Sequence, residues 1–131
     1  HTCMTMQNDE KYDDKKNVLE HKINSRFGEV KHKYSYKYDS NGLLIATYNE
    51  DGKIEENYKY DNNEKVTENY RFDIYGQTTR KFTLKYYNNG NVKETEELLY
   101  NDGVIYSQEM YKCNSNGKVT LYIKTNKGIP L

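Results

Sequence analysis

The chain has 131 residues and a mass of 15.6 kDa, the size of one ordinary domain. Lysine plus arginine and aspartate plus glutamate number 20 each, so the formal charge is zero and the composition argues against nucleic acid or an anionic membrane as a partner. Fifteen tyrosines and few aliphatic residues indicate a β protein with a thin core, because tyrosine suits a half-buried pleated surface. No apolar run is long enough for a transmembrane helix.

The first residues differ from the rest of the chain. Residues 1–11 are polar and carry no repeat pattern, which predicts a mobile tail before a single domain at residues 12–131. The start at His1 lacks an initiator methionine and fits a mature terminus, so we expect a secreted or periplasmic protein. In such a compartment Cys3 and Cys113 can form a disulfide, although Cys113 stands where other repeats have an aromatic residue, which favours a small buried thiol.

A repeat covers the remainder of the chain. Its eight glycines and two glycine-free equivalents, at residues 12–16 and 60–64, recur every 10 to 14 residues. An aromatic residue precedes most of these marks by four positions and an apolar residue follows nearly all of them by two, as in Tyr38, Gly42 and Leu44. An Asp or Asn after the aromatic can cap the turn, and glycine suits the left-handed residue of a type I turn with a bulge. The spacing therefore predicts one strand and one tight turn per repeat.

The predicted fold is all-β: an antiparallel meander of eight or nine strands built from tandem hairpins. We expect a strongly curved sheet, with a closed barrel as the alternative, since closure would protect both edges. The first strand has some helical spacing, so a helix stays open there. The predicted strands are residues 17–24, 29–38, 43–48, 53–60, 65–72, 77–87, 91–100, 104–113 and 118–125.

Alternation along these strands predicts one tyrosine-rich sheet face that also carries charged residues. The candidate binding residues on this face are Tyr34, Tyr36, Tyr48, Tyr58, Tyr70, Glu56, Glu68 and Arg80. Across a hairpin turning at residues 61–64, the pattern places Glu56 near Tyr70 and Tyr58 near Glu68, so that a phenol can donate to each carboxylate.

Two interpretations of this face stay open. The first is a structural cross-strand network that stabilises a thin sheet. The second is a groove whose tyrosine rings and charged groups bind a polar ring such as a sugar. Pairs of glutamates also allow a glycoside hydrolase, in which one carboxyl is an acid and the other a base or nucleophile.

Other kinds of site find little support in the sequence. His1, His21 and His32 lack metal-ligand spacing, so we expect no metal and no other cofactor. No basic cluster or helix start lies near Cys113 to activate it as a nucleophile with His32 as base. The lysines on the opposite side of the strands are interpreted as a solvated surface that discourages aggregation. They include Lys31, Lys33, Lys37, Lys59, Lys81 and Lys85.

The units at residues 38–44 and 86–92 resemble the hairpin repeats of the YD (RHS) and MORN-like families. A short chain made of such hairpins looks most like the bacterial domain-of-unknown-function family 3836, a resemblance that covers residues 12–128. It implies a secreted or periplasmic β protein with no catalytic residues to carry over. The segment at residues 84–90 also looks like repeats of bacterial antitoxin or immunity-type proteins, which implies a protein partner.

Together these observations predict a non-enzymatic binding or structural module that holds a glycan or a protein on its tyrosine-rich face. A hydrolase that uses paired glutamates and an immunity-type protein-binding repeat are the alternatives.

Overall fold

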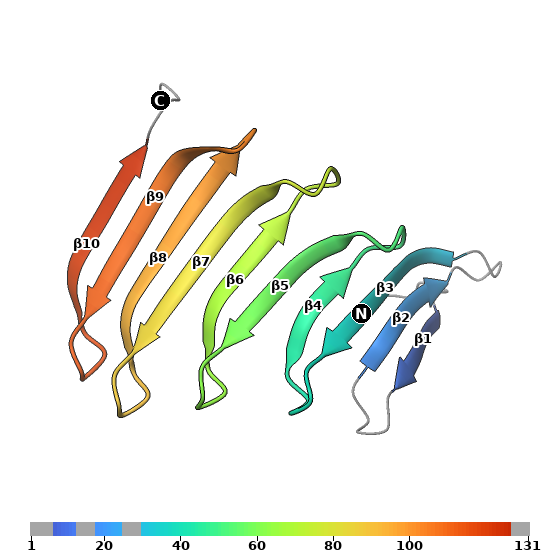
Figure 1. Ribbon diagram of the computed structural model, residues 1–131, viewed down its shortest axis with the longest axis horizontal. Coiled ribbons are helices and arrows are strands. Elements are labelled where there is room, and N and C mark those ends of the chain that lie inside the picture. The colour runs from blue at the N-terminus through green and yellow to red at the C-terminus, as the bar shows by residue number, and fades with distance from the viewer. Residues whose placement is uncertain (1–6, 13–17, 25–29, 127–131) are drawn as a thin grey trace. The chain divides into compact units, whose positions relative to one another are not determined.

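Figure 1 shows the computed structural model, which describes residues 7–12, 18–24 and 30–126. The described residues form ten strands and no helix, so no helix in them could cross a membrane. The strands are β1 (Gln7–Tyr12), β2 (Val18–Asn24), β3 (Val30–Tyr38), β4 (Leu44–Tyr48), β5 (Ile54–Tyr60), β6 (Val66–Phe72), β7 (Thr78–Tyr86), β8 (Val92–Asn101), β9 (Val104–Cys113) and β10 (Val119–Asn126).

The chain divides into two compact units, residues 1–55 and residues 56–131. In the first unit, β1 to β4 pair in chain order as an antiparallel meander. In the second unit, β5 to β10 do the same. No pairing among the described strands closes a barrel, because the strand order runs from β1 to β10 without returning. The predicted antiparallel meander is confirmed, and its sheet is open.

All nine predicted strands are present, with ends that differ from the predicted ones by one residue at most. Residues 18–24 form a strand, which settles the choice between strand and helix there. The prediction of a tail at residues 1–11 is wrong for residues 7–11, which belong to β1 and pair with β2. The turn mark at residues 12–16 explains this difference, because a hairpin needs a strand on both sides of its turn. Residues 1–6 lie outside the described part of the chain.

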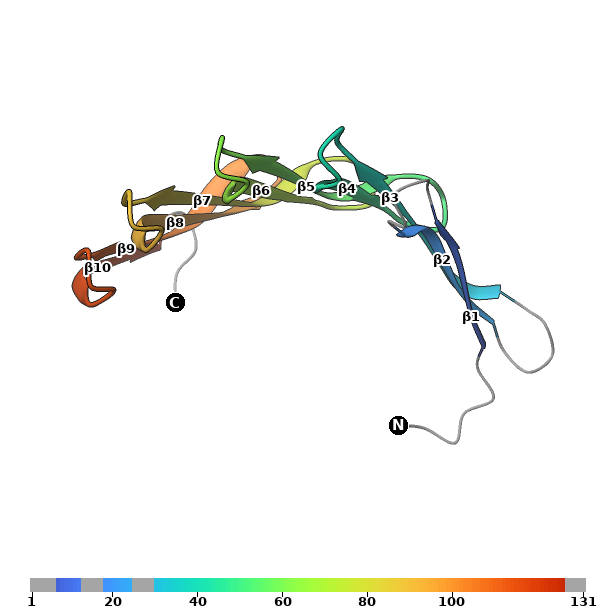
Figure 2. The same ribbon diagram turned by 90° about the horizontal axis from the view of Figure 1, so that it is seen from below.

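The described strands belong to one ten-stranded sheet, whose contacts fall into the two compact units. These strands have no shared core. Among the residues whose side chains are described, Ala46 is the one apolar side chain classed as buried, and none is fully buried. Each strand therefore contacts its neighbours in the ladder rather than a common interior, as in repeat proteins. Figure 2 shows β5 to β10 of the second unit as a single layer.

The turns follow the predicted chemistry. In the turn after β3, the side chain of Asp39 accepts hydrogen bonds from the backbone N–H groups of Asn41 and Leu43. Gly42 then adopts a φ of +84°, in the left-handed region. The turn after β5 has Glu64 in the place of glycine, with a φ of +64°. These turns fix where each strand begins and ends.

A register shift next to each tight turn decides which side chains share a face. Between β5 and β6, for example, Tyr60 pairs with Val66 but Lys59 pairs with Glu68, so one residue of β6 is left over. This is a β-bulge, in which two residues oppose one. Beyond it, the odd-numbered residues of β6 share a face with the even-numbered residues of β5. The prediction of one continuous tyrosine face assumed regular ladders beyond the turns and is wrong.

The second unit therefore has two mixed faces. The arginine face carries Glu56, Tyr58, Asn69, Arg71, Arg80, Phe82, Glu97, Glu109, Tyr111, Tyr122 and Lys124. The lysine face carries Lys59, Glu68, Tyr70, Lys81, Lys85, Glu94, Glu96, Gln108, Met110, Lys112, Leu121 and Ile123. With a single layer of strands and no second layer within this unit, both faces remain partly exposed.

Candidate functional site

The predicted tyrosines of the first unit do not share a face. Tyr34 and Tyr36 are two residues apart on β3 and so project from the same side. Tyr48 of β4 pairs with Ser35, the residue between them, so it projects from the opposite side.

In the second unit, the predicted residues are divided between the two faces. Glu56 and Tyr58 of β5 lie on the arginine face, where Arg80 of β7 also lies. Glu68 and Tyr70 of β6 lie on the lysine face, because the bulge after the turn reverses the parity of β6. The predicted pairs of Glu56 with Tyr70 and of Tyr58 with Glu68 are therefore wrong.

Each of these tyrosines donates instead to the glutamate two residues before it on its own strand. The Tyr58 hydroxyl donates to Glu56, and the Tyr70 hydroxyl donates to Glu68 Oε1 at 2.6 Å. The phenol-to-carboxylate bond that the sequence suggested is thus present, but it lies along the strand rather than across the hairpin.

On the arginine face, every predicted charged group has a partner of opposite charge. Glu56 accepts from Arg71, whose Nη2 lies 2.7 Å from Oε1. Arg80 donates to Glu97 Oε2 at 2.6 Å and, over a longer distance of 3.4 Å, to Asn69 Oδ1. These contacts match the interpretation as a structural network, and they leave the predicted carboxylates engaged.

The electrostatics of Glu56 oppose an acid role. Burial disfavours the ionised carboxylate, but hydrogen bonds from Tyr58, Arg71 and Asn69 and the charge of Arg71 outweigh it and lower the pKa of Glu56. A general acid in a glycoside hydrolase needs a raised pKa. Burial and the bond to Glu56 together raise the pKa of Tyr58 to about 12. This pair therefore holds one proton on the phenol and a charge on the carboxylate.

On the lysine face, Tyr70 lies between two ammonium groups. Lys59 Nζ lies 5.8 Å and Lys81 Nζ 5.7 Å from the centre of its ring, within the range of cation–π attraction. The Tyr70 ring also stacks on Phe72 at a centroid distance of 6.4 Å. The hydrogen bond to Glu68, together with burial, raises the pKa of Tyr70. Two ammonium groups and one carboxylate therefore contact Tyr70.

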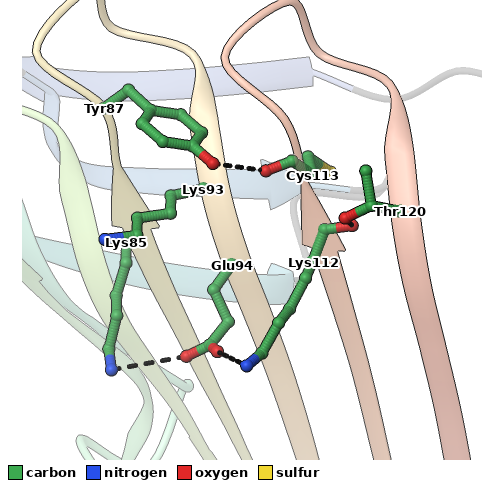
Figure 3. A pocket seen from close by; sticks show the side chains of 7 residues that line it. All are labelled: Lys85, Tyr87, Lys93, Glu94, Lys112, Cys113 and Thr120. Carbon is green, nitrogen blue, oxygen red and sulfur yellow. Dashed lines mark hydrogen bonds and ion pairs between the residues drawn. The ribbon is translucent and has the colours of Figure 1, made fainter.

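An open hollow of about 340 Å³ lies elsewhere, at the turn end of β7 to β10 (Figure 3). We call it the basic hollow. It is lined by Lys85, Tyr87, Lys93, Glu94, Lys112, Cys113 and Thr120.

The carboxylate of Glu94 organises the basic hollow. Lys85 Nζ lies 3.3 Å from its Oε2, and Lys112 Nζ lies 3.7 Å from its Oε1 (Figure 3). Register explains this convergence, because Lys85 and Lys112 are the two cross-strand neighbours of Glu94 in the ladders on either side of β8. The glutamate side chain is 21% exposed, whereas the two lysine side chains are 64% and 51% exposed. The ammonium groups thus reach solvent above a more deeply placed acid.

Residues that flank the turns complete the basic hollow. The Tyr87 hydroxyl donates to the Cys113 carbonyl oxygen at 2.7 Å, a bond that joins the residue after β7 to the end of β9 and fixes the ring. Lys93 Nζ lies 5.8 Å from the centre of the Tyr87 ring. The sequence pattern placed Lys85 on a solvated surface and singled out Cys113 as a thiol, but it did not predict that any of these residues form a site. The available signal was the position of Tyr87 and Lys93 on either side of one turn.

Metal or thiol chemistry gains no support from the described residues. Among them, no cluster of three or more His, Cys, Asp or Glu side chains is placed to hold a metal ion. The side chains of His1, His21 and His32 lie outside the described part. Cys113 is partly buried in the basic hollow, whereas Cys3 is not described, so their disulfide stays a prediction.

No protein family model matches the chain, and no curated protein is similar to it. One similar solved structure is a protein of unknown function from Bacteroides fragilis, with 12% sequence identity and a TM-score of 0.27 over 95% of this chain and 94% of that one. At that TM-score, the likeness carries no argument about fold or function.

Proposed function

We propose that the chain is a non-enzymatic binding module whose basic hollow holds an acidic sugar. The observation that carries this proposal is that Lys85, Lys93 and Lys112 all line a hollow whose lining contains one acid, Glu94. The glycan class is the one that the sequence suggested, but the binding site moves from the predicted tyrosine face to the turn end of β7 to β10.

Charge selects an anionic ligand. Three ammonium groups and one carboxylate leave the lining with a net charge of +2. Lys85 and Lys112 share the single charge of Glu94, so neither is fully neutralised by it. An anion 4 Å from an exposed ammonium group gains about 1 kcal/mol in a water-like dielectric. Two or three such contacts support weak, salt-dependent binding.

The remaining lining residues suit a sugar ring better than a bare anion. Tyr87 offers a ring whose position is fixed by its bond to the Cys113 carbonyl. Aromatic rings supply flat apolar area, while hydroxyl and ammonium groups supply directed hydrogen bonds, which is the usual division of roles in a small-molecule site. Thr120 of β10 adds a hydroxyl group that donates to the Lys112 carbonyl oxygen at 3.2 Å and can therefore accept a hydrogen bond from the sugar. A hexuronate combines the ring and the carboxylate that this lining fits.

The same geometry favours binding over hydrolysis. Glycoside hydrolases generally need two carboxyl groups beside the bond that is cleaved. The seven lining residues include one, Glu94, and two lysines contact it.

The test is an NMR titration of the whole protein with a galacturonate trisaccharide. A neutral galactose trisaccharide and sodium acetate serve as comparison ligands, which separate the contributions of the charge and the ring. We expect amide shift changes in residues that line the basic hollow, at millimolar affinity for galacturonate and more weakly for either comparison ligand.

Two variants and one matched control sharpen the titration. Lys85→Gln and Lys112→Gln should each weaken galacturonate binding about fivefold, since each removes one ammonium group. Lys59→Gln is the control, because Lys59 is 61% exposed and also contacts one carboxylate, but lies outside the hollow. Equal binding of the neutral sugar, or an equal effect of the control variant, would contradict the proposal.

A further inference from the structure

Among the strands that the structure describes, β10 is an edge strand with several exposed apolar side chains. Within the described residues, β10 pairs with β9 and with no other strand. Four of its apolar side chains are about half exposed: Val119 at 51%, Leu121 at 42%, Tyr122 at 48% and Ile123 at 46%. Such an edge presents unpaired backbone N–H and C=O groups, and natural proteins usually protect it with charges, proline or a short strand. β10 has eight residues and a single charge, Lys124.

The strand already paired with β10 shows which side chains suit it. On the arginine face, Tyr122 packs against Tyr111 at a centroid distance of 4.7 Å, and its hydroxyl donates to Glu109 at 3.0 Å. Lys124 pairs with the same Glu109, at 3.9 Å. On the lysine face, Ile123 is opposite Met110. A strand that suits β10 therefore carries an acidic and an aromatic residue on the arginine face and an apolar residue on the lysine face.

The charge of β10 and of the turn before it also favours an acidic neighbour. The chain from Asn114 to Asn126 contains Lys118 and Lys124 but no acidic residue. The Lys124 side chain is 50% exposed, and its contact with Glu109 is long for an ion pair, so it can also contact an acid on its other side. A second copy of β10 would instead bring a like-charged edge. The complementary occupant is an acidic strand.

We infer that β10 binds an extended segment of a partner protein, which adds to the sheet as the next antiparallel strand and places an acidic side chain beside Lys124. Its backbone would pair with the open edge, and its apolar residues would cover Leu121 and Ile123. β10 also contributes Thr120 to the basic hollow, but the three residues that would contact the partner, Leu121, Ile123 and Lys124, do not line it.

The test measures binding of a fluorescein-labelled peptide to the whole protein by anisotropy. The peptide has the sequence of residues 106–113 with serine in place of Cys113, so that it presents the side chains already seen opposite β10. A second peptide carries lysine in place of Glu109. We expect the first to bind about fivefold more tightly than the second.

A charge exchange makes the test specific. Lys124→Glu should reverse the preference, so that the lysine peptide binds more tightly than the acidic one. Lys59→Glu is a matched control, since Lys59 also lies 3.9 Å from a glutamate and is similarly exposed, but on β5. It should leave the preference unchanged. Circular dichroism confirms that both variants fold, and bound peptide should slow amide exchange at residues 119–126.

Three outcomes would overturn the inference. Equal binding of both peptides would remove the role of Lys124, and an unchanged preference in Lys124→Glu would place the peptide elsewhere. Concentration-dependent dimers without peptide binding would identify a second copy as the occupant. None of these outcomes bears on galacturonate binding, so the two proposals fail separately.

Discussion

The turn between β5 and β6 offers a direct test of the repeat, because it has a side chain where the other tight turns within residues 30–126 have glycine. Glu64 adopts a φ of +64°, and its N–H donates to the Asp61 carbonyl at 3.0 Å. A left-handed conformation costs an ordinary residue about 1–2 kcal/mol, whereas glycine brings an entropic cost of about 0.5–1 kcal/mol. Glu64→Gly should therefore raise the free energy of unfolding by about 0.5–1 kcal/mol.

The next turn along the chain allows the opposite substitution, in which a glycine at positive φ is replaced by a residue with a side chain. Gly76 has a φ of +82°, and no atom outside its neighbours lies within 4 Å of the position that a Cβ would take. Gly76→Ala thus adds backbone strain without a steric clash. We expect it to lower the free energy of unfolding by about 1 kcal/mol.

Urea unfolding followed by far-UV circular dichroism measures both changes in the same buffer. The two variants should shift the midpoint in opposite directions, with similar slopes. A Glu64→Gly protein less stable than the parent, or a Gly76→Ala protein as stable as the parent, would refute the assignment of these positions as strained left-handed turn residues.

Four further predictions concern the arginine face and its neighbours. Asn57→Val should raise the free energy of unfolding by about 1 kcal/mol in urea, because Asn57 Oδ1 is buried without a hydrogen-bond partner among the described residues. Asn69→Val should lower it by about 1–3 kcal/mol, since Asn69 is buried and its amide donates to the Asn57 carbonyl at 3.0 Å. The pKa of Glu56 is lowered on folding, so its stabilising effect is present above the unfolded pKa and lost as pH falls through the folded one. The Glu56→Gln protein should therefore have the same free energy of unfolding as the parent in acid and a lower one at neutral pH. The pKa of Tyr58 is raised to about 12 on folding, so its stabilising effect is present below the unfolded pKa and lost as pH rises through the folded one. The free energy of unfolding should therefore fall less between about pH 10 and 12 in Tyr58→Phe than in the parent.

The sequence predicted the strands well because their limits are set locally. An Asp or Asn that caps the turn and a residue with positive φ define each hairpin, as Asp39 and Gly42 do after β3. Such signals need no knowledge of distant contacts. The strand β1 was missed although the turn mark after it was identified, since a turn of this kind requires a partner strand before it.

The faces could not be predicted in the same way, because side-chain direction depends on counting residues across the bulges. One extra residue at each bulge moves Tyr70 to the face opposite Tyr58, although their spacing from the turn marks suggests a common face. The basic hollow was not predicted from the sequence for a related reason. Its central contacts join Lys85, Glu94 and Lys112 from three strands, and only the register of both ladders brings them together.

The central claim, that the basic hollow holds an anionic sugar through its excess positive charge, is tested most directly by Glu94→Gln. Removing this carboxylate raises the net charge of the lining from +2 to +3 and releases Lys85 and Lys112 for the ligand. Isothermal titration with the galacturonate trisaccharide at low salt should give binding about fivefold tighter than in the parent protein. Weaker or unchanged binding by a correctly folded Glu94→Gln protein would contradict the account.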